Sequence, residues 1–275
     1  MSRLTVTLID VGWGDSILIE SEDDHGNKQF ALVDSNDNAE MRSSYIFLRR
    51  HFEKLGKKVE SQNKPFFEFI MLSHAHTDHG RGLKSIMQVF GTKNFLYPKF
   101  HDPGICAELL RFSRRSSNVG HFQSVDDSDA ITLGDAVISF LWPKRNAVPL
   151  PDTENNNSVV MRLRLGNDSL ILNGDAEKEV WQQIKTSIPD DTKFFKVPHH
   201  GSVNGTFDGP NAAWLNNCPP EALLGISSHV TPHPHPSQRV IDLFNANHRR
   251  YFRTDISYHL SFSTEGNGIT PVYSH

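Results

Sequence analysis

The chain is poor in cysteine: its 275 residues include only Cys106 and Cys218, which lie far apart. Such a pair supplies neither a disulfide framework nor a CxxC metal motif, and it fits a reducing compartment. No apolar run approaches the roughly 18 residues that a membrane-spanning helix needs. The N-terminal segment, MSRLTVTLID, also lacks the basic and apolar regions of a secretory signal. We therefore expect a cytoplasmic protein with no membrane segment.

An excess of positive charge is also absent, because 28 lysines and arginines face 32 aspartates and glutamates, for a formal net charge of -4. A nucleic acid or another polyanion would therefore have to be bound locally. Histidine, in contrast, is abundant, with 15 residues, and it is the commonest metal ligand among the side chains. Neither repeats nor low-complexity tracts divide the chain, so we expect a single domain over residues 1–275.

Short apolar segments alternate with amphipathic ones along the whole chain. The strand-like segments, rich in Ile, Leu, Val and Phe, are residues 4–10, 16–20, 30–33, 69–73, 136–142, 159–165, 169–173, 194–197, 222–226 and 259–263. The helix-like segments are residues 39–55, 82–89, 107–115, 176–184 and 237–245. Only Gly-Asn-Asp separates 159–165 from 169–173, which predicts an antiparallel hairpin. This mixed order predicts an α/β protein with two sheets and helices outside them.

Four ligand-type side chains, His74, His76, Asp78 and His79, follow the strand-like segment 69–73 within the sequence SHAHTDHG. Side chains alternate along a strand, so His74 and His76 fall on one side, and the turn into the next helix can bring Asp78 and His79 to the same cavity. A His-rich surface turn is the alternative, but turns favour Gly, Asn, Asp and Pro. The motif therefore predicts a site for two metal ions.

This pattern resembles the His-x-His-x-Asp-His motif of the metallo-β-lactamase superfamily. The resemblance implies an αββα four-layer sandwich, two mixed sheets with helices outside, and a dinuclear metal site where loops converge at the sheet edges. It implies that Asp34, at a strand end, supports the metal loop, and that Asp175 supplies the bridging carboxylate. The last ligand is implied to be His199 or His200, with His199, nearer the strand end, preferred.

A finer resemblance connects segments from one end of the chain to the other. The matching segments are residues 10–16 (DVGWGDS), 155–160 (NNNSVV), 199–202 (HHGS), 233–236 (HPHP) and 251–255 (YFRTD). Together they resemble the soluble hydrolase domain of the ComEC-type DNA-uptake proteins. We find no counterpart of that family's membrane channel, and we expect a freestanding hydrolase for which a role in DNA uptake does not follow.

One departure from the superfamily pattern concerns the first metal site. The third histidine is due near residues 148–160, a stretch without histidine that offers Asn155, Asn157 and Ser158. Amide and hydroxyl oxygens bind a metal such as zinc more weakly than imidazole does. Because ComEC-like proteins share an Asn/Ser motif here, we interpret the change as a subfamily trait. His76, where that type often has an acidic residue, would partly compensate.

These assignments imply two divalent metal ions, with Zn²⁺ as first choice and Mn²⁺ as second. The ligands are assigned as His74 and His76 to one metal, Asp78, His79 and His199 to the other, and Asp175 to both. The catalytic residues are expected to be Asp78, Asp175 and His233, the last as an acid or oxyanion contact on a rigid Pro-rich run. The supporting or substrate-binding residues are expected to be Asp15, Asp34, Asn155, Asn157, Ser158, His200, Ser202, His235 and Arg253.

The leading hypothesis for the reaction is a metal-dependent phosphodiesterase or nuclease, because two metal ions suit hydrolysis and arginine suits phosphate. The expected partner is thus a phosphodiester, as nucleic acid or nucleotide, and no membrane. Two alternatives stay open. One is hydrolysis of a carboxyl substrate, such as a lactone, thioester or β-lactam. The other is a binding module in which the metal is structural and catalysis has been lost at Asn155–Ser158.

Overall fold

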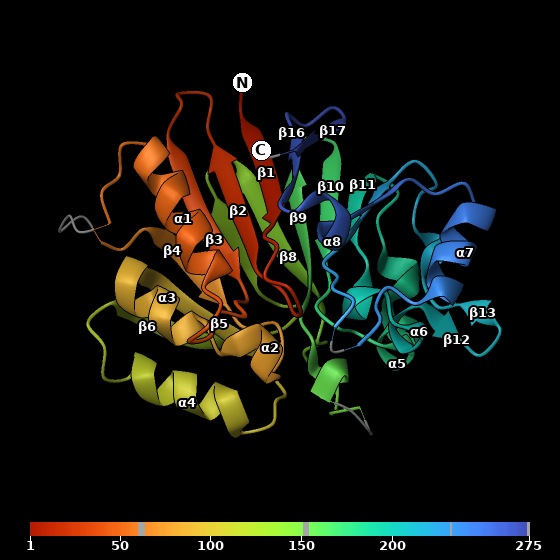
Figure 1. The fold of residues 1–275 in the computed structure, drawn as a ribbon, viewed down its shortest axis with the longest axis horizontal. Helices are drawn as coiled ribbons and strands as arrows, with labels where there is room; N and C mark the ends of the chain where they lie inside the picture. The colour runs from red at the N-terminus through yellow and green to blue at the C-terminus, as the bar shows by residue number, and fades with distance from the viewer. Residues whose placement is uncertain (60–63, 151–153, 232, 274–275) are drawn as a thin grey trace.

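Two β-sheets lie face to face in the computed structural model, which describes residues 1–59, 64–150, 154–231 and 233–273 (Figure 1). The first sheet contains, in spatial order, β17 (Ile269–Tyr273), β16 (Leu260–Thr264), β1 (Arg3–Leu8), β2 (Ile17–Glu22), β3 (Lys28–Val33), β4 (Phe67–Met71), β5 (Thr92–Pro98) and β6 (Val119–Val125). The second contains β15 (Tyr251–Arg253), β14 (Leu223–Ile226), β11 (Thr192–Lys196), β10 (Asp168–Leu172), β9 (Val160–Leu165), β8 (Ala136–Trp142) and β7 (Ala130–Leu133). A short ribbon pairs β12 (Phe207–Asp208) with β13 (Asn211–Ala212).

The core between the sheets follows from the two-residue period of the strands. On β1, Leu4, Val6 and Leu8 are fully buried in a cluster that also contains Leu163 and Leu170 of the second sheet. Alternate residues of a strand point to opposite faces, so every second residue of each strand needs to be apolar to form the core between the sheets. Each sheet is mixed: β3 to β6, and β10, β11, β14 and β15, are paired in parallel, and the other neighbours are antiparallel.

Helices cover both outer faces of the paired sheets, which makes four layers (Figure 1). Against the first sheet pack α1 (Ser43–Lys54), α3 (Leu83–Phe90) and α4 (Gly104–Ser113); against the second pack α5 (Lys178–Ile184) and α7 (Gln238–Ala246). Phe52 and Phe90 anchor the first helical layer and Trp181 and Phe244 the second, and all four are fully buried. The predicted αββα sandwich is confirmed.

Every predicted strand and helix overlaps an observed element, with shifts of a few residues at the ends. The predicted hairpin is β9 and β10, joined by Gly166 and Asn167. The strands that were not predicted are β5, β6, β7, β12, β13, β15 and β17. At the sheet edge, β6 exposes five of its seven residues, so it carries no buried alternating pattern. β15 is only three residues long.

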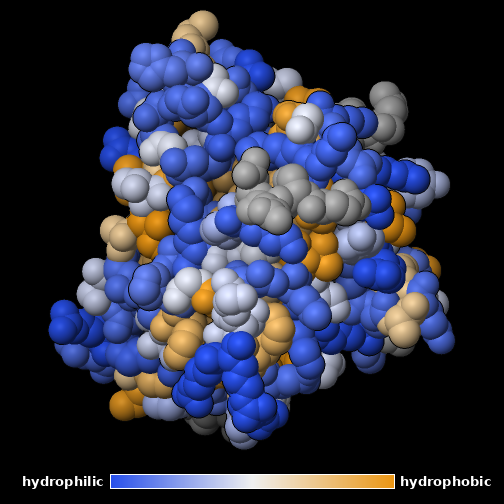
Figure 2. Space-filling view, turned by 90° about the vertical axis from the view of Figure 1, so that its left-hand side faces the viewer, coloured by the Kyte–Doolittle hydropathy of each residue, from blue (hydrophilic) through white to orange (hydrophobic). Residues whose placement is uncertain are grey.

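None of the described helices is long and apolar enough to cross a membrane. The face turned toward the viewer in Figure 2, which is the left-hand side of Figure 1, is mostly hydrophilic, and its apolar residues are scattered rather than joined in a band. Scattered surface apolar residues are normal for a folded protein in water.

The fold gathers the ligand-type residues at one edge of both sheets. In the first sheet, Asp34 and Ser73 follow directly on the ends of the parallel neighbours β3 and β4. In the second, Asp175 and His199 follow the ends of the parallel neighbours β10 and β11. Because parallel strands end at the same edge, each sheet contributes its loops to a shared site. Short helices in these loops are α2 (Thr77–Gly80), α6 (Val203–Thr206) and α8 (Thr254–Ser257), with the 3-10 turns η1 (Glu154–Asn157) and η3 (Pro198–Gly201). Two further 3-10 turns, η2 (Lys185–Ser187) and η4 (Leu215–Asn217), precede β11 and β14.

Candidate metal centre

The histidine motif enters the site directly after β4 and continues into α2. His74 is fully buried, and its Nε2 lies 3.1 Å from Nδ1 of His76. Its Nδ1 lies 3.1 Å from the hydroxyl of Ser73. Burial, helped by the nearby His79, holds the pKa of His74 well below its usual range, so this imidazole is neutral. A neutral imidazole is the form that binds a metal.

His79 is oriented by a buried carboxylate behind it. Its Nδ1 lies 2.7 Å from Oδ2 of Asp34, which also accepts hydrogen bonds from the amide and hydroxyl of Ser73. Burial lowers the pKa of His79, but Asp175 and Asp34 outweigh it and raise that pKa well above its usual value. Since Nδ1 of His79 donates its hydrogen to Asp34, Nε2 of His79 is left facing Asp175.

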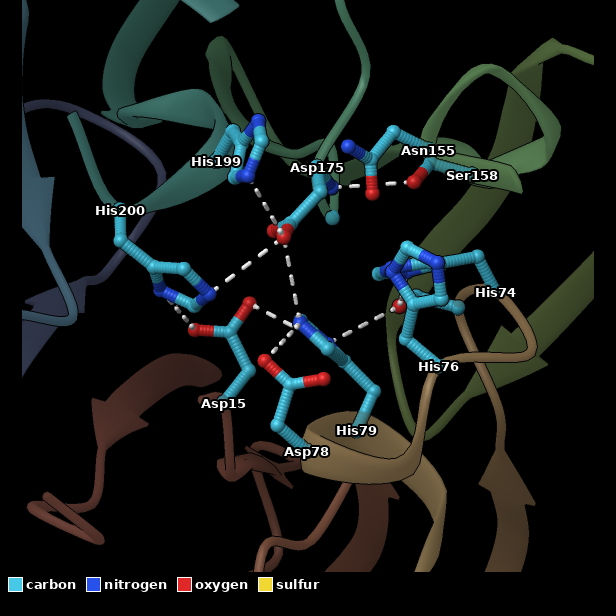
Figure 3. Close-up of polar contacts among 12 residues, drawn as sticks. Asp15, His74, His76, Asp78, His79, Asn155, Ser158, Asp175, His199 and His200 are labelled. Atoms are coloured by element: carbon cyan, nitrogen blue, oxygen red, sulfur yellow. Dashed lines mark hydrogen bonds and ion pairs between the residues drawn. The ribbon is translucent and has the colours of Figure 1, made fainter. Parts of the chain in front are cut away.

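Asp175 lies at the centre of the imidazoles (Figure 3). Its Oδ2 is 3.4 Å from Nε2 of His79, 3.4 Å from Nε2 of His200 and 3.9 Å from Nε2 of His199. Its backbone amide donates to the hydroxyl of Ser158, which fixes the loop after β10. Burial raises the pKa of Asp175, but His200, His79 and His199 outweigh it and hold the carboxyl well below its usual range. Asp175 is therefore charged.

The two neighbouring histidines after β11 have different environments. His200 is fully buried; its Nδ1 lies 3.0 Å from the carbonyl of Ser227, so Nε2 points toward Asp175. The side chain of His199 is 20% exposed, and its Nδ1 lies 3.1 Å from Oε1 of Glu177. His199 is the ligand expected from the resemblance, whereas the close ligand groups of the described residues include His200 and not His199. A positive φ at both residues produces this arrangement, which sequence order alone does not reveal.

The donor atoms of this cluster suit a divalent cation. Groups of ligand atoms within 4.8 Å of one another are His74 with His79 and Asp175, Asp78 with His79 and His200, Asp15 with Asp175 and His200, and Asp15 with Asp34 and His79. Among the described residues, Nε2 of His79, Nε2 of His200 and Oδ1 of Asp175 are buried without a hydrogen-bond partner. Buried polar atoms without partners are costly, and a bound cation would satisfy all three. The residues present therefore fit a metal.

A buried lysine lies beneath the cluster. Nζ of Lys196 is 2.8 Å from Oδ2 of Asp15, and both side chains are almost completely inaccessible to solvent. Burial raises the pKa of Asp15, but Lys196 and His200 outweigh it and lower that pKa overall. Lys196 also donates to the carbonyl of Gly174, one residue before Asp175. The lysine thus ties Asp15 to the loop that carries the central carboxylate.

The segment that lacks the third histidine forms η1. Nδ2 of Asn155 donates to Glu177 at 2.9 Å, and its buried Oδ1 has no partner among the described residues. Nδ2 of Asn157 instead donates to Glu154, which also accepts from the amide of Ala75 in the histidine loop. Asn155 lines the cleft above the metal ligands. Of the three oxygen donors expected from the sequence, Asn155, Asn157 and Ser158, Asn155 is thus the one that lines the cleft with a free side-chain oxygen near the candidate ligands.

The cluster opens into a cleft of about 510 Å³. The cleft is lined by Trp13, His76, Thr77, Asp78, Arg81, Asn155, Asp175, His199, His233 and His235. The indole of Trp13 lies 4.9 Å from the ring of His233 and 5.4 Å from that of His235, centroid to centroid. Burial and the neighbouring His199 and His200 lower the pKa of His235 to about 4, so His235 is neutral at pH 7.

Two residues expected to contact substrate lie differently in the structure. Arg253 is absent from the described lining of the cleft, and its guanidinium pairs with both carboxylate oxygens of Asp255, at 3.0 and 2.6 Å. The hydroxyl of Ser202 accepts from the amide of Gly205, and its own amide donates to His199. Arg253 and Ser202 therefore make their polar contacts within their own loops, with residues two or three positions away.

Several cleft and support residues did not appear among the expected site residues: Trp13, Arg81, Glu154, Glu177 and Lys196. For three of them a signal existed, because Trp13 is part of the DVGWGDS segment, Arg81 follows the histidine motif, and Lys196 precedes the HHGS segment. Glu154 and Glu177 also lie close in sequence to expected site residues, Asn155 and Asp175, but their hydrogen bonds to Ala75 and Asn155 are made across the fold.

No family model matches the sequence. Over 256 residues, 91% of the chain, the sequence is 26% identical to ComE operon protein 3 of Bacillus subtilis. Over 143 residues it is 27% identical to the uncharacterized protein YcaI of Escherichia coli. The matched parts make up 32% and 15% of those two proteins, so the chain spans at most about a third of the curated relatives it matches.

Solved structures share the architecture over nearly the whole chain. The metallo-β-lactamase fold protein YhfI from Bacillus subtilis has a TM-score of 0.56 at 12% identity, with 95% of this chain and 100% of that chain covered. Igni18, a metallo hydrolase from Ignicoccus hospitalis, has a TM-score of 0.53 at 13% identity, with 98% and 100% covered. CmlA, a diiron β-hydroxylase from Streptomyces venezuelae, has a TM-score of 0.55 at 13% identity, with 94% and 53% covered. The chain therefore has the metallo-β-lactamase fold, and over most of its length its sequence is similar to a part of ComE operon protein 3.

Proposed function

We propose that the protein is a dinuclear metal-dependent hydrolase that acts as a phosphodiesterase, on a nucleic acid or a nucleotide. The observation that carries the proposal is the convergence of His79, His200 and Asp175: Nε2 of each histidine and Oδ1 of the aspartate are buried without a hydrogen-bond partner among the described residues. Asp175 also lines an open cleft with His76, Asp78 and His199, so a substrate in the cleft would lie next to this cluster. The same fold occurs in a hydroxylase, so the fold does not determine the reaction. The proposed reaction therefore has to be argued from the residues of the site.

The residues divide into two candidate sets of metal ligands. Asp78, His79 and His200 would hold one cation and His74, His76 and the oxygen of Asn155 the other, with Asp175 between them. Bound divalent cations lower the pKa of a water ligand and polarise the substrate bond. Zn²⁺ is the first choice for such a His/Asp set and Mn²⁺ the second.

The chain's own residues provide orientation and proton transfer. Asp34 keeps Nε2 of His79 toward the cavity, and the carbonyl of Ser227 does the same for His200. The exposed His233 lines the wall of the cleft and would protonate the leaving oxygen. His235 is unsuited to that role at pH 7, because with a pKa of about 4 it holds no proton to donate.

The test is hydrolysis by purified protein loaded with Zn²⁺ or Mn²⁺. We expect cleavage of bis(para-nitrophenyl) phosphate and of single-stranded DNA. Asp175→Asn should lower kcat/KM by more than about 100-fold, since loss of even an outer-shell partner of a metal ligand costs 10- to 100-fold. Asp24→Asn, on an exposed aspartate, is the matched control and should leave kcat/KM unchanged.

The same panel includes nitrocefin, a lactone and a thioester. Hydrolysis of one of these without any phosphodiester cleavage would favour a carboxyl substrate. Tight binding of about one metal ion with no hydrolysis of any substrate would instead favour a binding module. Either result contradicts the proposed phosphodiesterase.

A further inference from the structure

Arg81 brings a permanent positive charge to the wall of the cleft. Of the described residues that line the cleft, it is the one with a guanidinium or ammonium group; the others are aromatic, amide, hydroxyl, imidazole or carboxylate side chains. It follows α2, three residues after Asp78, and its backbone amide donates to the carbonyl of Thr77. The charge is therefore built onto the same turn that carries a candidate metal ligand.

The guanidinium is held from one side only. Its Nε donates to Oδ1 of Asn36 at 2.6 Å, and Asn36 is itself 1% exposed. Nδ2 of Asn36 donates in turn to the carbonyl of Trp13, on the neighbouring loop of the cleft. No hydrogen bond or ion pair to the terminal Nη1 and Nη2 of Arg81 occurs within the described part of the chain. The two terminal amines are left for a ligand.

Close backbone packing keeps this turn in place. A Cβ on Gly82 would lie 2.2 Å from the hydroxyl of Ser35 and 2.7 Å from the amide of Asp37. A Cβ on Gly14 would lie 2.2 Å from the carbonyl of Asp78. The loop after β1, the loop after β3 and the turn of α2 thus touch without space between them. The backbone of Arg81 is consequently held close to that of Asp78, while its side chain is exposed.

The other cations near the site are already neutralised. Arg253 makes two hydrogen bonds to Asp255, and Lys196 is buried against Asp15. Arginine presents a planar set of donors that matches two oxygens of a phosphate, which lysine does not. An anionic group that enters the cleft can therefore form an ion pair with the guanidinium of Arg81.

We propose that Arg81 is a specificity-determining residue: it binds a non-bridging oxygen of the substrate phosphate and makes the enzyme select anionic phosphodiesters over neutral esters. This inference rests on the proposed phosphodiesterase function and names the residue that recognises the substrate charge. Asn36 acts as a positioning residue for the guanidinium through the bond to Nε.

The experiment compares two substrates that have the same para-nitrophenolate leaving group. One is anionic bis(para-nitrophenyl) phosphate and the other is its neutral methyl triester. Arg81→Gln should lower kcat/KM for the diester by about 10- to 100-fold, the range for one hydrogen bond to a charged group. For the triester it should change kcat/KM less than about twofold, because no anionic oxygen is lost. The kcat/KM of Arg81→Lys for the diester should lie between those of the wild type and Arg81→Gln, because lysine keeps the positive charge but lacks the planar pair of donors.

Arg164→Gln is the matched control, because Arg164 is also exposed and also donates through Nε, to the carbonyl of Gly166 at the far end of β9. It should leave both substrates unaffected. An equal loss for diester and triester in Arg81→Gln, with the circular dichroism spectrum unchanged, would overturn the inference. So would an unchanged diester rate.

A binding measurement separates this inference from the proposed function. The dissociation constant of inorganic phosphate for the metal-loaded protein, measured by calorimetry, should rise about 10-fold or more in Arg81→Gln. If the wild type cleaves no phosphodiester but this weakening is observed, the proposed function fails and Arg81 remains the anion-binding residue. If phosphate binds equally to both proteins, the inference about Arg81 is wrong whatever the enzyme hydrolyses.

Discussion

At the scale of single residues, the site depends on which nitrogen of each imidazole faces the cavity. His79 and His200 both use Nδ1 for a hydrogen bond to the protein, with Asp34 and with the carbonyl of Ser227, and both turn Nε2 toward Asp175. A hydrogen bond at the far nitrogen sets the tautomer and orientation of a metal-binding histidine. Asp34 therefore affects metal affinity although its own oxygens are used by His79 and Ser73.

We predict that Asp34→Asn weakens metal binding about 10- to 100-fold, the usual cost of losing an outer-shell carboxylate. Competition with a chromogenic chelator measures the affinity, and Asp24→Asn on the exposed surface is the control. Burial raises the pKa of Asp34, so the protein does not strongly stabilise the charged form of this carboxyl. Replacing it with the neutral amide of asparagine therefore removes no strongly stabilised charge. Equal affinities in Asp34→Asn and the wild type would show that His79 needs no orienting partner.

The candidate ligands could be predicted from the sequence where spacing carries the information. His74, His76, Asp78 and His79 lie within six positions, and the structure brings them to one site with Asp175. The choice between His199 and His200 could not be predicted, because it depends on backbone torsions in η3. Nor could the pairing of Arg253 with Asp255, which depends on side-chain contacts within its loop.

At the scale of elements, the loops of the site are held by helix ends and glycines. Asp37, on the loop after β3, accepts from the amides of Ser44 and Tyr45 in the first turn of α1. The same loop packs against Gly82 at the start of α3, whose amide donates to the carbonyl of Ser35. Periodicity predicted α1 and α3 because each buries one apolar face, but it carries no information about loops in contact.

Gly82→Ala tests this contact, because Gly82 has a φ of -80° and an alanine there clashes without backbone strain. Overpacking costs about 1–3 kcal/mol, which for a protein of this size lowers Tm by about 3–10 °C. Gly104→Ala at the start of α4 is the matched control, since its Cβ would meet nothing within 4 Å. Differential scanning calorimetry should show a lower Tm for Gly82→Ala and an unchanged Tm for Gly104→Ala. A Tm of Gly82→Ala equal to that of the wild type would mean that the loop after β3 can move away from Gly82 without cost.

At the scale of the whole molecule, the candidate metal centre joins the two sheets. His74 and His79 follow β4 of the first sheet, whereas Asp175 and His200 follow β10 and β11 of the second. Both sheets therefore supply donors, although the first sheet supplies more of the residues in the close ligand groups than the second. A cation bound by donors of both sheets stabilises the folded protein, because the unfolded chain does not hold these donors together.

We therefore predict that Zn²⁺ or Mn²⁺ raises Tm. At a free metal concentration 100 times Kd, binding adds about 2.7 kcal/mol, or about 5–10 °C at this size. His200→Ala should lose most of this increase, and His25→Ala, on an exposed histidine, should keep it. A Tm that does not respond to metal in the wild type would contradict a site shared by the two sheets.

The effect of pH on metal binding follows from His79. Burial lowers its pKa, but Asp175 and Asp34 outweigh burial and raise it well above the usual value, so the metal-free protein holds a proton there at pH 7. A cation must displace that proton, so binding should release about one proton from this site at pH 7 and weaken as the pH falls. Calorimetry in buffers of different ionisation enthalpy counts the protons. Asp34→Asn removes a carboxylate that raises the pKa of His79, so metal binding to this variant should release fewer protons. If the variant releases as many protons as the wild type, the displaced proton comes from another residue.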